Sequence, residues 1–133
     1  MAALDTNVLV RFLVHDDEAQ LQAARRLIES QLQQGMALFV PVTVVLELEW
    51  VLRARYRFNK ATVVKALSDL LSTQELRFDR EHALEIALNL YKQEGADLAD
   101  SLHLALAHEA RERPLWTFDR LASRLPGAQA VPV

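Results

Sequence analysis

Four acidic side chains stand where strands end or where apolar helices run, positions at which an unpaired charge is costly. Asp5 and Asp119 each follow a short apolar run that predicts a buried strand. Glu47 lies on or beside an apolar stripe, and Asp100 lies near the start of a largely apolar helix. If these carboxylates met in one site, they would repel one another by several kcal/mol. A hard divalent cation would offset that repulsion, and all-oxygen ligands favour Mg²⁺ or Mn²⁺ over zinc.

Each of these acids also has a purely structural interpretation. Asp5 and Asp119 are acceptable caps for the turn or helix that follows, and Asp119 has Arg120 beside it as a partner for an ion pair. Asp97 is the expected N-cap of the helix that carries Asp100, or a support for that side chain. For these two helix positions we assign the chemistry to Asp100 and the cap to Asp97.

Glu47 and Glu49 differ in what their neighbours offer them. Glu49 has Arg53 four residues later, so we expect an ion pair on a solvated helix face. Glu47 has no cation at the corresponding positions, and its neighbours three and four residues away are mostly apolar. The charge of Glu47 therefore needs a stabilising group from elsewhere in the fold.

The composition excludes several other kinds of site. The chain has 133 residues, 51% of them apolar, which is enough for one core, so we expect a single domain over 1–133. The absence of cysteine excludes disulfides, thiolate nucleophiles and sulfur-ligated metals. His103 and His108 are five residues apart, unlike the helical zinc motif, and the three glycines form no phosphate-binding loop.

Charge and hydropathy indicate where the protein works. A net charge of −3 gives no general attraction to polyanions, so any basic surface must be local. No basic leader precedes Asp5, and the apolar run over 38–52 is interrupted by Pro41 and by two glutamates. We therefore expect a cytoplasmic protein that does not enter a membrane.

Short strand-like runs alternate with longer helical patterns along the whole chain. We expect strands at 2–4, 37–40, 76–78, 115–118 and 130–131, and helices after Asp5 and at 18–34, 44–56, 60–71, 84–91 and 98–112. Gly35 and Pro114 are the expected stops of two helices, and Asn59 is an expected N-cap. The alternation predicts a three-layer α/β/α sandwich with a mostly parallel central sheet. Ligands of such folds bind beyond the carboxyl ends of the strands, where Asp5 and Asp119 are expected.

The order and spacing of the four acids resemble the motifs of PIN-domain nucleases, and most closely those of the VapC-type ribonuclease toxins of toxin-antitoxin pairs. The resemblance spans almost the whole chain, and its motif segments are 4–8, 41–52, 97–102 and 116–119. It implies that the acids that act in catalysis and hold the metal are Asp5, Glu47, Asp100 and Asp119. It implies supporting roles for Thr6, Asn7, Asp97 and Thr117.

The family resemblance also implies an activity and a set of partners. Members are expected to cleave RNA with Mg²⁺ or Mn²⁺, to form homodimers and to be inhibited by a cognate antitoxin protein. We interpret the activity as hydrolysis of the phosphodiester bond by a water molecule that the metal activates. Whether RNA or DNA is the substrate does not follow from the carboxylates themselves.

A local basic cluster follows Glu47 in the sequence. Its members are Arg53, Arg55, Arg57 and Lys60, four positive charges within eight residues. They are candidates for contacts with RNA phosphates. The alternative is that they interact with the helix dipole and with nearby acids.

Two other functions compete with the nuclease interpretation. A phosphatase with an aspartyl nucleophile also begins with an acid after the first strand, but Asn7 stands where such enzymes place a second acid. The chain could also be a catalytically silent binding module that has kept the fold. Intact acids at all four motif positions argue against the silent module.

Overall fold

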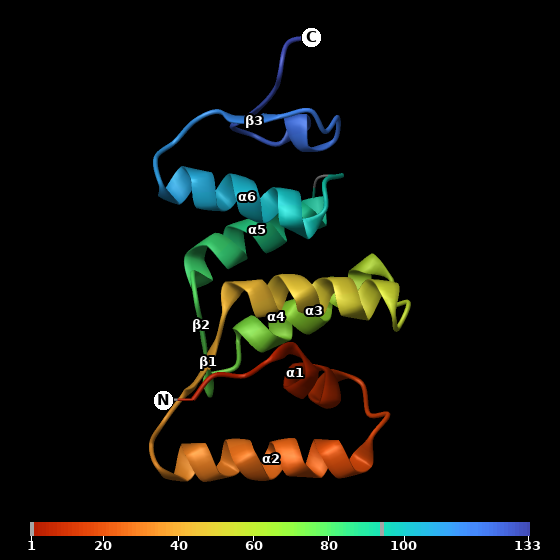
Figure 1. Ribbon diagram of the computed structural model, residues 1–133, viewed down its shortest axis with the longest axis vertical. Helices are drawn as coiled ribbons and strands as arrows, with labels where there is room; N and C mark the ends of the chain where they lie inside the picture. Colours follow the sequence, from red (N-terminus) through yellow and green to blue (C-terminus); the bar gives the residue numbers. More distant parts are fainter. Residues whose placement is uncertain (1, 94) are drawn as a thin grey trace. The chain divides into compact units, whose positions relative to one another are not determined.

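The computed structural model describes residues 2–93 and 95–133 (Figure 1). The chain divides after Asp79 into two compact units. The first unit contains α1 (Thr6–Leu13), α2 (Glu18–Gln33), β1 (Leu38–Val40), α3 (Val42–Ala54), α4 (Lys60–Leu71) and β2 (Leu76–Phe78). The second contains α5 (Glu81–Gln93), α6 (Leu98–Glu109), β3 (Leu115–Thr117), the 3₁₀ turn η1 (Ala122–Arg124) and β4 (Ala128–Ala130). Every helix in the described part of the chain is too short or too polar to span a lipid bilayer.

In the first unit, β1 and β2 form a parallel pair in which Val40 is opposite Phe78. Ala3 adds a parallel bridge to Phe39, so the expected strand at 2–4 is present as a single bridge. Helix α1 packs against both α2 and α3, and α3 packs against α4. Apolar side chains from all of these elements except α2 and β2 supply the most deeply buried positions: Leu9, Leu38, Val40, Leu48, Leu52 and Val63.

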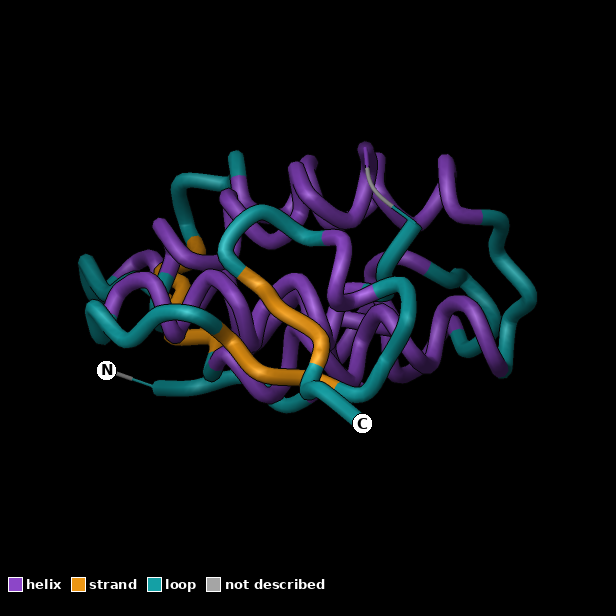
Figure 2. Tube along the Cα trace, turned by 90° about the horizontal axis from the view of Figure 1, so that it is seen from above, coloured by secondary structure: helices purple, strands orange, loops and turns teal. Residues whose placement is uncertain are grey.

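In the second unit, α5 and α6 pack along each other. Strand β3 pairs in parallel with β4, with Thr117 opposite Ala130. Strands are drawn in orange in Figure 2. Gly127 lies between η1 and β4 with a φ of +96°, a conformation that favours glycine. A Cβ at this position would also collide with the imidazole of His108, which would have to move to make room. One buried apolar cluster of this unit consists of Ala96, Leu104 and Leu125.

The structure confirms the expected α/β class with parallel strands. Helix α4 and strand β2 cover the residues expected for them, 60–71 and 76–78. The side chain of Asn59 caps α4 by accepting a hydrogen bond from the Thr62 amide at 2.8 Å. Gly35, with a φ of +74°, follows the end of α2 as expected. The described strands form two short parallel pairs, one in each unit.

The last helix is shorter than its sequence pattern predicts. The expected helix at 98–112 ends at Glu109, because Arg111 adopts a left-handed φ of +61° that no continuing α-helix contains. The turn is closed by a hydrogen bond from the Glu112 amide to the Ala107 carbonyl at 3.0 Å. Pro114 therefore lies beyond the turn that ends the helix.

Candidate active site

Asp5 lies where the first extended segment meets α1, and it is the N-cap of that helix. Its backbone is extended, and its Oδ1 atom accepts a hydrogen bond from the Thr6 amide at 2.7 Å. The capping interpretation of Asp5 is therefore correct. A carboxylate has more lone pairs than one such bond uses, and the side chain is exposed, so capping leaves it able to bind a cation.

The Thr6 hydroxyl joins α1 to α3 by donating a hydrogen bond to Oε1 of Glu47, 41 residues away. Thr6 is 3% exposed, so its rigid side chain holds this donor in place. Glu47 itself is exposed rather than buried, and the hydroxyl is a stabilising partner that its own helix does not supply. Because Thr6 follows Asp5 directly, this bond brings the two acids of the first unit to the same end of α1. Asn7 is exposed in the first turn of the same helix.

Glu49 shows that an ion pair predicted from spacing need not lie on the surface. The expected pair with Arg53 is confirmed, with 2.8 Å between Arg53 Nε and Glu49 Oε2. The expected solvated face is wrong, because the Glu49 side chain is only 5% exposed and lies on the face of α3 that also buries Leu48 and Leu52. Arg53 therefore neutralises a buried carboxylate. For this residue, the alternative that the basic cluster interacts with nearby acids is correct.

The other members of the basic cluster lie beyond Arg53, around the end of α3. Arg55 is the C-cap residue of α3, and Arg57 adopts a φ of +57° in the turn that follows. Lys60 begins α4. All of these side chains are exposed.

In the second unit, Asp97 caps α6 as expected, with its Oδ1 atom accepting from the Asp100 amide at 2.8 Å. Burial raises the pKa of Asp100 above its ordinary value, and the negative charges of Asp97 and Asp119 raise this pKa further. A hydrogen bond with Asp97 also raises it, whereas the charge of His103 opposes the shift. Three acids thus act on one another here, and the proton stays on Asp100 to higher pH than it would on an isolated aspartate.

Asp119 follows β3 and organises the turn that contains η1. Its Oδ1 atom accepts from the Ala122 amide at 2.8 Å, which confirms the interpretation of Asp119 as a cap. The hydroxyl of Thr117 accepts from the Asp119 amide at 2.9 Å and so fixes the backbone next to the acid. The neighbouring Arg120 is in none of the ion pairs formed between described residues.

A second polar cluster in the first unit was not predicted. Asp16, in the loop after α1, accepts hydrogen bonds from Arg11 and, at 3.0 Å, from the hydroxyl of Tyr56. Burial would raise the pKa of Asp16, but these hydrogen bonds outweigh it and hold the pKa below its ordinary value. Tyr56 follows α3 and is 40 residues from Asp16, so no local pattern reveals the contact. The cluster ties the end of α1 to the end of α3, the helix that carries Glu47.

The acids named by the sequence thus form two groups, Asp5 with Glu47 in the first unit and Asp97, Asp100 and Asp119 in the second. Both groups offer carboxylate oxygens, the donor type that Mg²⁺ and Mn²⁺ prefer. Across residues 2–93 and 95–133, no three His, Cys, Asp or Glu side chains lie close enough together to form a metal site. The donor chemistry of each group therefore fits a hard cation, and neither group forms a complete ligand set.

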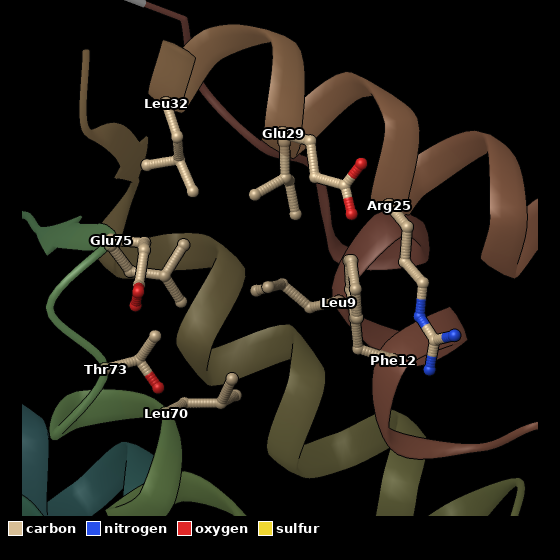
Figure 3. Close-up of a pocket in the computed structure, with 10 residues that line it drawn as sticks. Leu9, Phe12, Arg25, Glu29, Leu32, Leu70, Thr73 and Glu75 are labelled. Atoms are coloured by element: carbon tan, nitrogen blue, oxygen red, sulfur yellow. The ribbon is translucent and has the colours of Figure 1, made fainter. Parts of the chain in front are cut away.

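A cavity of about 410 Å³ opens in the first unit between α1, α2 and the segment from the end of α4 to β2 (Figure 3). Leu9 and Phe12 line it from α1, Ile28 and Leu32 from α2, and Leu70 from α4. Charged side chains also belong to the lining, namely Arg25, Glu29 and Glu75. The cavity is thus an apolar groove with charges of both signs.

The helical apolar stripe of α2 is only partly core. Leu21 is buried, as a core position should be, and Ile28 is half-buried in the lining of the cavity. Leu27 is 44% exposed. Ile28 is half-buried because it lines the cavity, whereas Leu27 lies outside that lining.

Comparison with known proteins identifies the family to which this chain belongs. The PIN domain family model matches residues 2–128, a range that includes both groups of acids, so the chain belongs to the PIN domain family. Among individual proteins, the chain is similar to a VapC ribonuclease from Aquifex aeolicus (strain VF5). The two are 25% identical over 125 residues, which cover 94% of this chain and 92% of that protein.

Proposed function

We propose that this protein is a metal-dependent endoribonuclease and the toxin component of a type II toxin-antitoxin pair, with both units forming one nuclease domain. The observation that carries the proposal is that the acids at the four motif positions are not neutralised by arginine or lysine in the described structure. Its ion pairs are Arg11–Asp16, Arg53–Glu49 and Lys65–Asp69, and they include none of these acids. Membership of the PIN family and similarity to a VapC ribonuclease support the same function.

In this proposal the ligands of Mg²⁺ or Mn²⁺ are Asp5 and Glu47 from the first unit and Asp100 and Asp119 from the second. The bound ion would acidify a water molecule and offset the negative charge that develops on the phosphate. Thr6 orients the carboxylate of Glu47, Thr117 fixes the backbone of Asp119, and Asp97 sets the first turn of the helix that carries Asp100. The fourth supporting position, Asn7, presents an exposed amide one residue further along α1.

The proposal includes an RNA substrate, a cytoplasmic location, a homodimer and a cognate antitoxin. Because Arg53 is held by Glu49, contacts with RNA phosphates are assigned chiefly to the exposed Arg55 and Arg57. Neither the phosphatase nor the silent module is favoured by a feature of the structure.

The test of the proposed activity compares acids inside and outside the motifs. Asp5→Asn and Asp100→Asn should abolish chelator-sensitive cleavage of single-stranded RNA while circular dichroism shows an intact fold, because each removes a charged metal ligand. Asp69→Asn is the matched control, since Asp69 is an exposed acid paired with Lys65. Cleavage by the Asp5→Asn protein at the rate of the parent would refute the assignment, as would an equal loss in the control.

We assign the cavity of the first unit to the antitoxin, because an apolar groove with charges of both signs suits an amphipathic segment of a protein partner. Leu32→Glu places a charge in the lining of the groove and should weaken antitoxin binding, measured by calorimetry, without changing RNA cleavage. Met36→Glu is the control, because Met36 is exposed to a similar extent and is not part of the lining. Equal binding by the Leu32→Glu protein and the parent would place the antitoxin elsewhere.

A further inference from the structure

Trp50 is a large aromatic side chain that the first unit leaves half-exposed. It lies on α3 three residues after Glu47, so the two side chains are about one helical turn apart on neighbouring parts of the same face. Its exposed fraction is 47%. A single exposed apolar residue is ordinary in a folded protein, so the exposure by itself indicates nothing about function.

The side chains around Trp50 indicate a role for its exposed ring. The guanidinium carbon of Arg55 lies 5.6 Å from the centroid of the indole ring, within the range of a cation–π contact. Arg57 and Lys60 follow Arg55 in the sequence and are exposed as well. An aromatic ring with an arginine beside it is a combination with which proteins bind single-stranded nucleic acid, because the ring stacks on a base while the cation approaches a phosphate.

The charge distribution favours a nucleic acid over a second copy of this chain at this surface. Two copies that met here would bring their basic clusters together, and like charges in contact oppose association. A polyanion instead gains from the exposed guanidinium groups of Arg55 and Arg57. The flat face of the indole ring can stack on any unpaired base of such a polyanion.

We propose that Trp50, with Arg55 against its indole ring, is the stacking platform for an unpaired base of the RNA substrate. The inference rests on the proposed function, and it adds a substrate-binding residue that acts through a base rather than through a phosphate. Glu47 and Trp50 are separated by about 4.5 Å along the axis of α3. The stacked base therefore belongs to a nucleotide next to the phosphate that is cut, and Trp50 selects substrates that are unpaired at that position.

The test uses the fact that the chain has two tryptophans, Trp50 and Trp116. In a Trp116→Phe protein Trp50 is the remaining tryptophan, and a single-stranded oligoribonucleotide should quench its fluorescence because a base stacks on it. An abasic oligomer of equal length and a double-stranded RNA should leave the signal unchanged, because neither offers an unpaired base.

Binding and cleavage are then measured separately. Trp50→Ala should raise the dissociation constant for the single-stranded oligomer in chelator about 5- to 150-fold, the loss expected for one stacked base, and should not alter binding of the abasic oligomer. In Mn²⁺ it should raise KM with little change in kcat. Trp50→Phe keeps an aromatic ring and should bind close to the parent. Circular dichroism confirms that both variants are folded.

The outcomes separate this inference from the function on which it rests. A parent protein that neither binds nor cleaves RNA overturns both. A parent that cleaves RNA, with equal binding by the parent and the Trp50→Ala protein or an equal loss for the abasic probe, overturns the stacking role and leaves the nuclease assignment standing. Sedimentation that shows a dimer in the parent and a monomer in the Trp50→Ala protein assigns the ring to a second copy of the chain and likewise overturns the stacking role.

Discussion

The two groups of acids are held in different ways. In the first unit, Asp5 and Glu47 each accept a hydrogen bond from a neutral donor, the Thr6 amide and the Thr6 hydroxyl. In the second unit, Asp100 faces the negative charges of Asp97 and Asp119, and its pKa is raised by burial and by that repulsion. The first group is therefore organised before a cation arrives, whereas the second keeps a repulsion that a cation would relieve.

This difference matters for the proposed metal site. In the first group, the hydrogen bonds from Thr6 hold the carboxylates in place before a cation binds. In the second group, a cation would relieve the repulsion between the acids, and this relief would add to the free energy of binding. Substitutions in the first unit should therefore act mainly on cleavage, and substitutions in the second should act also on stability and on its response to metal.

Among the substitutions that test this difference between the two groups, Thr6→Val should have the largest effect. The effect should be on RNA cleavage. Valine has nearly the shape of threonine but no hydroxyl, so Glu47 loses the donor that orients it. Residues that support metal ligands in this way typically contribute about 10- to 100-fold in activity, and we expect a loss in that range, measured as initial rates in Mn²⁺.

Thr6→Ser is the control for this prediction, because serine keeps the hydroxyl. It should retain most of the activity that Thr6→Val loses. An active Thr6→Val protein would show that the hydrogen bond to Glu47 has no part in positioning the ligand.

A smaller effect is expected in thermal denaturation with and without metal. Mn²⁺ at about a hundred times its dissociation constant should stabilise the parent protein by about 2.7 kcal/mol, because the ion binds the folded state. Asp100→Asn should raise the melting temperature in chelator, since it removes a repelled charge, and should reduce the rise that Mn²⁺ produces.

The same experiment with Asp69→Asn provides the reference, because Lys65 and Asp69 form an exposed ion pair outside the motifs. That variant should respond to Mn²⁺ as the parent does. If the Asp100→Asn protein gains as much from Mn²⁺ as the parent gains, Asp100 is not a ligand.

The smallest expected effect concerns the pH dependence of stability. The pKa of Asp100 is raised in the folded state, so between the ordinary value of 3.8 and the raised value the folded protein binds more protons than the unfolded chain. The contribution of Asp100 to stability therefore falls as the pH rises through this interval. Asp97→Asn removes one of the repelling charges and should make that fall smaller, measured by urea denaturation across acidic pH in chelator.

Asparagine also caps helices well, so α6 should remain intact in the Asp97→Asn protein. A direct NMR titration of the Asp100 carboxyl in this variant should give a lower pKa than in the parent. An unchanged pKa would mean that burial and the charge of Asp119 account for the shift without Asp97.

Local features of this protein could be predicted from the sequence because their causes lie within a few residues. The caps at Asn59 and Asp97 depend on side chains that bond to amides three residues later, and both were predicted. The ion pair between Glu49 and Arg53 was predicted for the same reason. The end of α6 was not, because the helical pattern continues past Glu109 and the left-handed turn at Arg111 carries no sequence signal as strong as a glycine.

The sequence by itself determined the order of helices and strands and the types and positions of the acids, because periodicity and capping act over one or two turns of the chain. Only the tertiary structure decided that Glu49 is buried and that the Thr6 hydroxyl supports Glu47. Burial depends on which helix face packs against the core, and the contact between Thr6 and Glu47 joins residues 41 positions apart. Both features depend on surfaces that meet only after the chain has folded, so no local stretch of sequence reveals them.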